Sequence, residues 1–473
     1  MKKNLLALLL LVVMLVNVFA MASCNLLPGT GDDGNQEEEG KINITFYHTM
    51  GSNLSTVLNN YIEVFEAQFP FINVIHSQVG SYDDVRDTVS TELSVGAQPN
   101  ITYCYPDHVA LYNVALAVTV LDDYIDYEGE FTFSSIDGAP VTIDGIGLTQ
   151  EQKDDFIQGY YEEGRQFGDG KMYSLPLSKS TEVLYYNKTF FEKEGLTVPT
   201  TWEEMEEVCA AIKAKYPDST PLGYDSEANW FITMCEQLKT PYTSAEKGNH
   251  FLFDNADNHA FVKDFREWFV KGYVTTQDIL GGYTSDIFKT QTSFMSIGSS
   301  AGATHQAPTN GEFEVGIVPI PQADPNNKKV ISQGPSVCIL ENANREEVMA
   351  SWLFVKFLTT NVNFQAEFSE VSGYVPVIKS VANDDYYKNE FLAFANGYKD
   401  GIAALSAQVC LAQESYYYTS PAFNGSSTAR DQVGILLQKC FAVKGTTDAE
   451  IDAAIRQAFK DAIEECEYQV GQN

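Results

Sequence analysis

Strand-like and helix-like segments alternate along residues 41–117, and this alternation constrains the fold more than any other feature of the sequence. Short apolar segments suited to strands lie at 41–48, 71–76 and 101–104. Segments at 53–69, 82–95 and 107–117 carry apolar side chains at helical spacing. The order β-α-β-α-β predicts a parallel sheet with helices on both faces. The expected fold class is therefore α/β.

The same alternation returns after a break, which indicates a second α/β unit. An apolar strand is expected at 183–186, and a helix at 201–215 begins with Thr201 three positions before Glu204, the spacing of a capping box. Later strands are expected at 313–319 and 330–340, and later helices at 230–238, 259–271, 346–359, 431–441 and 448–467. Because late segments return to the first unit, we expect two lobes joined by several crossings.

The N-terminus has the pattern of an export signal. Two lysines precede an apolar run over residues 5–20, and the run ends in MASC at 21–24. Small residues before a cysteine at this position resemble the lipobox of bacterial lipoproteins, in which the cysteine is acylated. We therefore expect a signal peptide over 1–23, lipidation at Cys24 and a flexible acidic tether over 24–40. The alternative is a retained transmembrane helix.

Charge and cysteine usage restrict the possible partners. Acidic residues outnumber basic ones 64 to 30, and such an acidic chain disfavours binding to nucleic acid. None of the 8 cysteines forms a CxxC motif or has a histidine at zinc spacing, so we expect no metal site and no cofactor. If Cys24 is lipidated, at least one other thiol stays unpaired. Cys440 and Cys466 are the pair to test for a disulfide.

Several motifs occur in one order between residues 41 and 469. The most specific is LYYNK at 184–188 followed by PTTWEEM at 199–205. Others are ITFYHTMG at 44–51, FMSIGSSAG at 294–302, VGIVPIPQ at 315–322, WLFVKFLTT at 352–360 and GYVPV at 373–377. The ordered series resembles family 1 extracellular solute-binding proteins, the sugar-type receptors of ABC importers. Within that family, the chain resembles the glycerol-3-phosphate-binding receptors.

The resemblance implies a periplasmic-binding-protein-like fold, in which two α/β lobes enclose a ligand cleft and close about a hinge. The first lobe would comprise 41–155 plus 313–372, and the second 156–312 plus 373–473. The resemblance also implies a monomer that is lipid-anchored at the cell membrane and faces the extracellular side or the periplasm. Such a protein passes a small polar solute to the permease subunits of an ABC importer.

Ligand contacts are expected where strands end, because ligands of open α/β sheets bind beyond the carboxyl ends of the strands. Tyr47 and His48 end the first strand, with ordinary loop packing as the alternative. Asp107 follows the third strand and would accept hydrogen bonds from paired hydroxyls, unless it only caps the following helix. Ser299 and Ser300 precede an expected helix N-terminus, whose backbone N–H groups suit oxygen-rich ligands.

The resemblance adds further ligand contacts. Positions that match ligand-facing residues of the related receptors are Tyr82, Lys179, Ser180, Gly334 and Tyr374. Trp230 lies where related receptors place an indole near bound sugar. Its face would stack on the C–H groups of a sugar ring, and a position in the core is the alternative.

One position argues against glycerol 3-phosphate as the ligand. The arginine that grips the phosphate in the related receptors is replaced at about Ala422, and Arg430 matches a different arginine. Without a guanidinium, a phosphate group lacks its bidentate partner. We therefore favour a neutral mono- or oligosaccharide, with glycerol 3-phosphate or a glycerophosphodiester as the alternative.

Two functions of other classes stay open, a secreted glycoside hydrolase and a sensory lipoprotein. Paired carboxylates are uninformative among 64 acidic residues. GSSAG at 298–302 fits a nucleophile-elbow motif, but no acid lies between Ser300 and His305, the last histidine of the chain. We therefore expect no catalytic residue. A sensory lipoprotein would use the same fold without transport.

Overall fold

The computed structural model describes residues 36–246 and 248–472. The expected signal peptide and the lipidation site at Cys24 lie outside this part of the chain. Within it, no helix combines the length and the apolar character that crossing a membrane requires. Both sheets and the helices that pack on them lie in the unit that begins at Glu37.

The first sheet has the strand order β2-β1-β3-β13-β6. β1 (Ile42–His48) pairs in parallel with β2 (Ile72–Gln78) and β3 (Ile101–Cys104), as the sequence pattern predicts. β13 (Ser336–Ile339) and β6 (Leu175–Pro176) extend the sheet with antiparallel pairing. The expected α/β class is confirmed. The two antiparallel strands come from distant parts of the chain, so local periodicity does not predict their place in this sheet.

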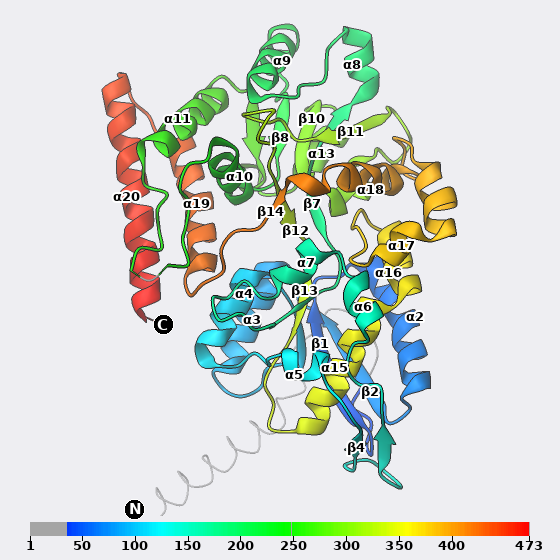
Figure 1. The fold of residues 1–473 in the computed structure, drawn as a ribbon. Coiled ribbons are helices and arrows are strands. Elements are labelled where there is room, and N and C mark those ends of the chain that lie inside the picture. Colours follow the sequence, from blue (N-terminus) through cyan, green and yellow to red (C-terminus); the bar gives the residue numbers. More distant parts are fainter. Residues whose placement is uncertain (1–35, 247, 473) are drawn as a thin grey trace, which may run out of the picture. The chain divides into compact units, whose positions relative to one another are not determined.

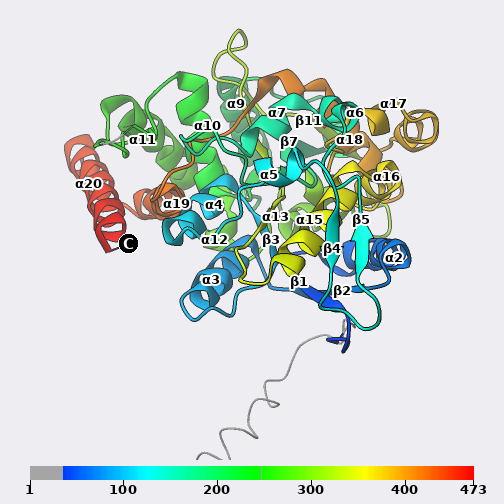
Figure 2. The same cartoon turned by 60° about the horizontal axis from the view of Figure 1, so that its bottom comes forward.

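Helices cover both faces of the first sheet, because successive side chains of its strands point to opposite sides. Tyr103 and Val337 belong to a core with α2 (Ser52–Gln68) and α15 (Arg345–Thr360). Cys104 and Cys338 belong to a different core with α3 (Tyr82–Leu93) and α4 (Pro106–Tyr112). A hairpin of β4 (Phe131–Phe133) and β5 (Val141–Ile143) extends beside α15 and α2 (Figure 2).

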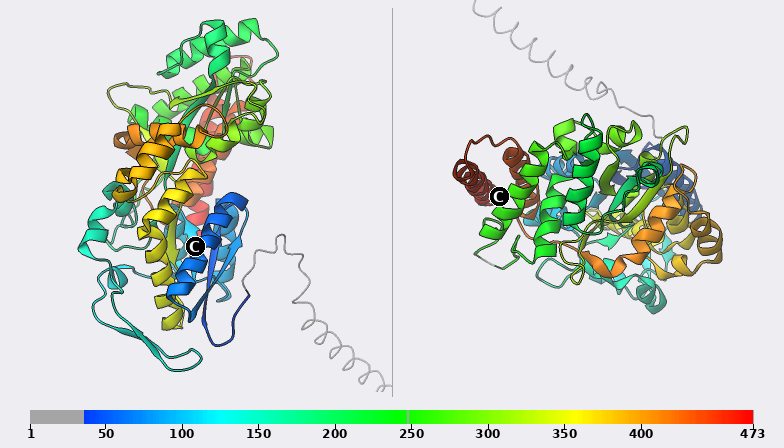
Figure 3. Two further views of the ribbon diagram at one scale, coloured as in Figure 1. Left: turned by 90° about the vertical axis from the view of Figure 1, so that its right-hand side faces the viewer. Right: turned by 90° about the horizontal axis from the view of Figure 1, so that it is seen from above.

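The second sheet has the order β14-β12-β7-β10-β8-β9, and β11 also pairs with β7. Its strands are β7 (Ser180–Asn187), β8 (Leu222–Tyr224), β9 (Val274–Thr276), β10 (Met295–Ser299), β11 (Val315–Pro319), β12 (Val330–Gln333) and β14 (Tyr417–Tyr418). Figures 1 and 3 show this sheet and its helices at one end of the unit and β1 and β2 at the other.

A separate core joins the second sheet to its helices. Trp202, Trp230 and Phe265 are among its largest side chains. The helices are α9 (Trp202–Lys215), α10 (Glu227–Leu238), α11 (Ala256–Val270), α19 (Ser426–Phe441) and α20 (Asp448–Gln472). The predicted capping box at the start of α9 is confirmed, because the Thr201 hydroxyl accepts from Glu204 N–H and the Glu204 carboxylate accepts from Thr201 N–H.

The chain crosses between the two sheets at neighbouring segments that bind one another. Residues 177–179 connect β6 to β7, and residues 334–335 connect β12 to β13. Leu177 N–H donates to Pro335 O at 3.0 Å, and Lys179 and Val375 exchange backbone hydrogen bonds of 3.1 and 2.7 Å. Gly334 has φ of +99°, and a Cβ there would lie 2.8 Å from Lys179 Cα, so this close approach requires glycine.

These pairings refine the expected lobes at the level of strands. β11 and β12 pair with β7 in the second sheet, although residues from 313 onward were expected in the first lobe. β6 pairs with β13 in the first sheet, although residues from 156 onward were expected in the second. The chain changes sheets at the crossings, and no local pattern marks those points. The full lobe ranges stay a proposal.

Candidate binding cleft

A cleft with a volume of 890 Å³ is lined by elements of both sheets. From the first sheet come the loop after β1, the start of α3 and the residue after β3. From the second come β7, the start of α10, the end of β10 and one face of α19. Several of these positions directly follow a strand, which agrees with the expectation that the site lies beyond the strand ends.

Three tyrosines form an aromatic wall on the side of the first sheet. The rings of Tyr82 and Tyr105 stack with centroids 4.4 Å apart and an interplanar angle of 17°. The Tyr82 and Tyr374 hydroxyls lie 3.3 Å apart. Burial raises the pKa of all three phenols, so they are neutral and can donate and accept hydrogen bonds. The capping box of Ser81 and Asp84 sets the start of α3 and so places Tyr82.

A hydrogen-bonded network lines the cleft on the side of the second sheet. Tyr224 OH donates to Glu182 Oε2 at 2.6 Å, and Asn229 Nδ2 donates to Glu182 Oε1 at 2.9 Å. Asn229 Nδ2 also lies 3.0 Å from Gln333 Oε1, and Asn229 Oδ1 accepts from Arg430 Nη2. The network thus joins β7, α10, β12 and α19.

Burial governs the charges of this network. Burial raises the pKa of Glu182 to about 7, although the hydrogen bonds from Tyr224 and Asn229 lower it. Burial alone would lower the pKa of Arg430, but attraction to the Asp107 carboxylate raises it. Arg430 therefore keeps its charge at the cleft, where its hydrogen-bond partner is the neutral Asn229 amide.

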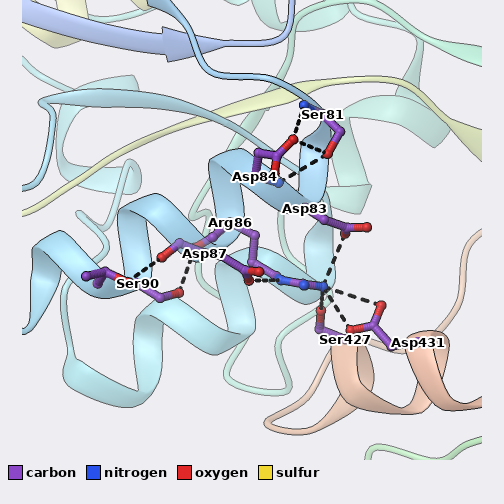
Figure 4. Close-up of polar contacts among 9 residues, drawn as sticks. Ser81, Asp83, Asp84, Arg86, Asp87, Ser90, Ser427 and Asp431 are labelled. Atoms are coloured by element: carbon purple, nitrogen blue, oxygen red, sulfur yellow. Dashed lines mark hydrogen bonds and ion pairs between the residues drawn. The ribbon is translucent and has the colours of Figure 1, made fainter. Parts of the chain in front are cut away.

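One arginine bridges the two sides at the edge of the cleft (Figure 4). Arg86 of α3 lies with Nη1 3.1 Å from Asp431 Oδ2 and 3.0 Å from Ser427 Oγ, both on α19. Its Nη1 also lies 3.2 Å from Asp83 Oδ1, and its Nε lies 2.8 Å from Asp87 Oδ1. Burial raises the pKa of Asp431 to about 6, and the Arg86 charge opposes this rise. Asp83 and Asp431 also line the cleft.

The structure brings several of the expected ligand contacts together. Tyr82, Ser180, Ser299 and Tyr374 all line the cleft. Asp107 lines a smaller cavity that adjoins it. These five residues, which were expected from the resemblance or from their position after a strand, thus lie in one region of the molecule.

The structure places Trp230 in the core of the second lobe and not at the cleft. Its side chain is 0% exposed and stacks on Phe265 and Tyr224, with centroids 3.9 and 4.9 Å away. The reason is helical phase. Asn229, the preceding residue, points to the cleft, so Trp230 lies about 100° further around α10 and packs inward. The core alternative is the arrangement observed.

Tyr47 and His48 also lie beneath the cleft surface. Tyr47 OH lies 3.4 Å from Glu92 Oε1 in the core under α3. His48 is fully buried, its Nε2 lies 2.8 Å from His76 Nδ1, and its Nδ1 accepts from Met50 N–H at 3.1 Å. The loop that follows β1 does line the cleft, through Thr49 and Gly51. His48 therefore positions this loop from below.

The remaining expected contacts support the crossing segments. Lys179 is 0% exposed and forms an ion pair of 2.7 Å with Glu163, and it also donates to Ser336 Oγ at 3.1 Å. Ser300 is buried, and its Oγ accepts from Thr181 N–H at 3.2 Å. Gly334 allows the close approach of the crossing at Lys179. These three residues do not line the cleft.

Sequence reasoning missed most of the polar network. The missed cleft residues include Tyr105, Glu182, Asn229, Gln333 and Asp431. Glu182 had a usable signal, because it directly precedes the apolar run 183–186, and an acidic residue beside such a run is rarely buried without a partner. Asn229 and Gln333 had none, since their importance follows from the packing of α10 and β12 against β7.

Among the described residues, no group of three or more histidine, cysteine or acidic side chains could hold a metal ion. The seven cysteines in this part of the chain are buried free thiols, and Cys440 and Cys466, the pair singled out for a disulfide test, are among them.

The chain is similar in sequence to bacterial solute-binding proteins. A family model of the bacterial extracellular solute-binding protein matches residues 60–395. The chain is 23% identical over 383 residues to the multiple sugar-binding protein of Streptococcus mutans, with 78% of this chain and 83% of that protein covered. It is 24% identical over 356 residues to the sn-glycerol-3-phosphate-binding periplasmic protein UgpB of Escherichia coli K12, with 71% and 74% covered.

Solved structures show the same fold. UgpB of Mycobacterium tuberculosis in complex with glycerophosphocholine superposes with a TM-score of 0.69 at 18% identity, covering 92% of this chain and 100% of that one. Maltose-bound MalE3 of T. maritima superposes with a TM-score of 0.69 at 17% identity, covering 89% and 99%. The expected two-lobe fold is confirmed.

Proposed function

Because the chain belongs to the bacterial extracellular solute-binding protein family, we propose that it captures a mono- or oligosaccharide and delivers it to an ABC importer. The composition of the cleft carries this proposal, since stacked tyrosines and a buried polar network line the same space. Aromatic faces pack on the C–H groups of a sugar ring, and amide and carboxylate groups bind its hydroxyls. The sugar-binding relative in Streptococcus mutans supports this choice of solute.

The proposed ligand contacts are those that line the cleft. Among the residues expected from the sequence they are Tyr82, Ser180, Ser299 and Tyr374, and the polar network adds Glu182, Asn229 and Arg430. Glu182 would accept hydrogen bonds from sugar hydroxyls. Its two oxygens already accept from Tyr224 and Asn229, which fixes the carboxylate in place before the ligand arrives.

A ligand panel tests the proposal. Neutral sugars, oligosaccharides, glycerol 3-phosphate and glycerophosphodiesters are screened by thermal shift, and hits are measured by calorimetry. We expect one neutral saccharide to bind, and Glu182→Gln to weaken its binding at least tenfold. Glu414→Gln, at an exposed glutamate of the second lobe, is the matched control. Absence of binding across the whole panel would refute the assignment to sugar-like solutes.

Glycerol phosphate compounds are the second candidate, and Arg430 is the observation that favours them. The loss of an arginine at Ala422 argued against a phosphate ligand, yet Arg430 brings a guanidinium to the cleft from α19. A guanidinium can bind a phosphate group through two parallel hydrogen bonds. If a phosphate compound is the hit of the panel, Arg430→Met should abolish its binding, and the circular dichroism spectrum of the variant should show that it is still folded.

We also propose that the chain is attached to the cell membrane through a lipid on Cys24. The sequence pattern at residues 21–24 supports this attachment. Cells that express the wild type should incorporate labelled palmitate into the protein and retain it in the membrane fraction. Cys24→Ser should prevent labelling and release the protein. Equal labelling of both forms would contradict the proposal.

Capture without turnover separates this function from the glycoside hydrolase alternative. The Ser300 hydroxyl of the GSSAG motif is buried and accepts from Thr181 N–H, which supports a structural role for it. A bound oligosaccharide should be recovered intact after prolonged incubation, and appearance of shorter sugars would favour the enzyme. A permease gene beside this one would favour transport, and a histidine kinase gene would favour sensing.

A further inference from the structure

A second, smaller cavity adjoins the cleft and is built by both lobes. It has a volume of 60 Å³ and shares Tyr105, Gln333 and Arg430 with the lining of the cleft. Its lining includes the loop after β3, the end of helix α7 (Gln158–Glu163), β12 and the segment 419–421. The three shared side chains thus stand between the two spaces.

The cavity contains polar atoms that have no partner in the described part of the chain. Four buried oxygens of lining residues are unpaired: Asp107 Oδ2, Glu163 Oε2, Ser332 Oγ and Ser420 Oγ. Glu163 as a whole is 3% exposed, so bulk solvent does not reach it. A buried polar atom without a hydrogen bond is strongly unfavourable. The cavity is therefore suited to an occupant that forms hydrogen bonds with these atoms.

The unpaired atoms define the chemistry of that occupant. Carboxylate oxygens only accept, so the occupant must donate hydrogen bonds. The charges of both carboxylates are already balanced, because Glu163 Oε1 pairs with Lys179 Nζ at 2.7 Å and Asp107 is attracted to Arg430. A neutral donor therefore fits better than a cation. Ile232, Ile331 and Pro421 add apolar surface for C–H groups.

The volume limits the size of the occupant. A water takes up about 30 Å³ in the liquid, so the cavity has room for roughly two waters. An end group of one or two carbons with hydroxyl groups has a similar size, whereas a complete sugar ring is larger. The cavity is thus suited to the end of a polyol and not to a whole saccharide unit.

We propose that this cavity is a subsite of the cleft and takes a neutral hydroxyl-bearing end group of the solute, such as a vicinal diol or a hydroxymethyl group. The O–H groups donate to Asp107 Oδ2 and Glu163 Oε2, and the two serine hydroxyls complete the hydrogen bonds. The inference rests on the proposed function in that the rest of the same solute occupies the cleft. Because both lobes contribute, filling the subsite also favours their observed arrangement.

Glycerol is the probe that tests the subsite without knowledge of the natural solute. Its binding to the full mature chain is measured by saturation-transfer NMR. We expect millimolar binding of glycerol and none of 1,2,3-trimethoxypropane, which has the same carbon chain but no O–H donors. Ser332→Val and Ser420→Leu should each weaken glycerol binding at least tenfold. Ser94→Val is the control, because Ser94 is exposed at the end of α3 and lines neither the cavity nor the cleft.

The possible outcomes separate the subsite from the proposed function. Equal glycerol signals in the wild type and both serine variants overturn the subsite, as does absence of glycerol binding, which means that the cavity holds ordered water only. Sugar binding without glycerol binding overturns the subsite alone. Glycerol binding without any hit in the saccharide panel overturns the sugar assignment alone. Asp107→Asn, which keeps the shape of the side chain, should weaken glycerol binding even if a serine variant fails to fold.

Discussion

The buried pair of His48 and His76 predicts a loss of stability in mild acid. Met50 N–H donates to His48 Nδ1, so the proton of the neutral ring is on Nε2 and is donated to His76 Nδ1. His76 Nε2 lies 2.7 Å from Asn59 Oδ1 and continues the chain of hydrogen bonds. A proton on His48 Nδ1 would break the bond from Met50. Burial and the neighbouring His76 lower the pKa of His48 from 6.5 to about 3.

The sign and the size of the effect follow from this pKa. Between pH 6.5 and about 3 the unfolded chain binds a proton at His48 that the folded chain does not, so stability falls as the pH falls through this window. Between pH 7.5 and 5.0 the free energy of unfolding should decrease by about 2 kcal/mol through His48 alone. Glu182 and Asp431 act in the opposite direction, because their raised pKa values make protonation favour the folded state.

A variant isolates the contribution of His48 from those of the carboxylates. His48→Gln keeps an N–H donor near His76 but cannot take up a proton. Urea unfolding of wild type and variant at pH 7.5 and 5.0 gives the four free energies. The variant should lose about 2 kcal/mol less than the wild type between the two pH values. His305→Gln, at an exposed histidine, controls for the removal of one imidazole. Equal losses in wild type and His48→Gln would refute the reasoning.

Three further predictions concern the bridge, the crossing and the core. Arg86→Met removes the contact between α3 and α19 and should weaken solute binding several-fold. A double-mutant cycle of Arg86→Met and Asp431→Asn should give a coupling free energy of about 1 kcal/mol in solute binding. Additive effects of the two substitutions would contradict the bridge. Lys179→Met leaves the Glu163 carboxylate buried and unpaired, so the free energy of unfolding in urea should fall by about 3–5 kcal/mol. The double variant Lys179→Met with Glu163→Gln removes both charges and should recover most of this loss. Trp230→Ala should lower the free energy of unfolding by about 3–5 kcal/mol, because the indole is fully buried. Trp230→Phe keeps an aromatic ring in the core and should leave the affinity for the solute unchanged. A tenfold loss of affinity in a stable Trp230→Phe protein would argue for direct contact with the solute.

Local patterns in the sequence determined the elements that depend on neighbouring residues. The parallel core of β1, β2 and β3 follows from the alternation of strands and helices over residues 41–117, because consecutive β-α-β units pair in parallel. The start of α9 follows from Thr201 and Glu204, whose side chains cap backbone groups only three positions away. The family followed from motifs in a fixed order, and the family model confirms it.

The tertiary structure alone decided which polar side chains meet. Glu182, Asn229 and Arg430 come from β7, α10 and α19, and their contacts arise from the packing of these elements against one another. Asn229 and Trp230 are neighbours in sequence, yet helical phase sends one to the cleft and the other to the core. His48 ends a strand at the expected edge of the sheet, but its ring lies beneath the loop that it supports.

The sequence by itself thus determined the α/β class, the first parallel strands and the family, because these depend on local periodicity and on motifs with fixed spacing. Only the tertiary structure decided the sheet membership of β11 and β12 and the polar network of the cleft. It alone also formed the small cavity around Asp107 and Glu163. The physical reason is that these features join residues far apart in the chain, and the direction in which each side chain points depends on the packing of whole elements.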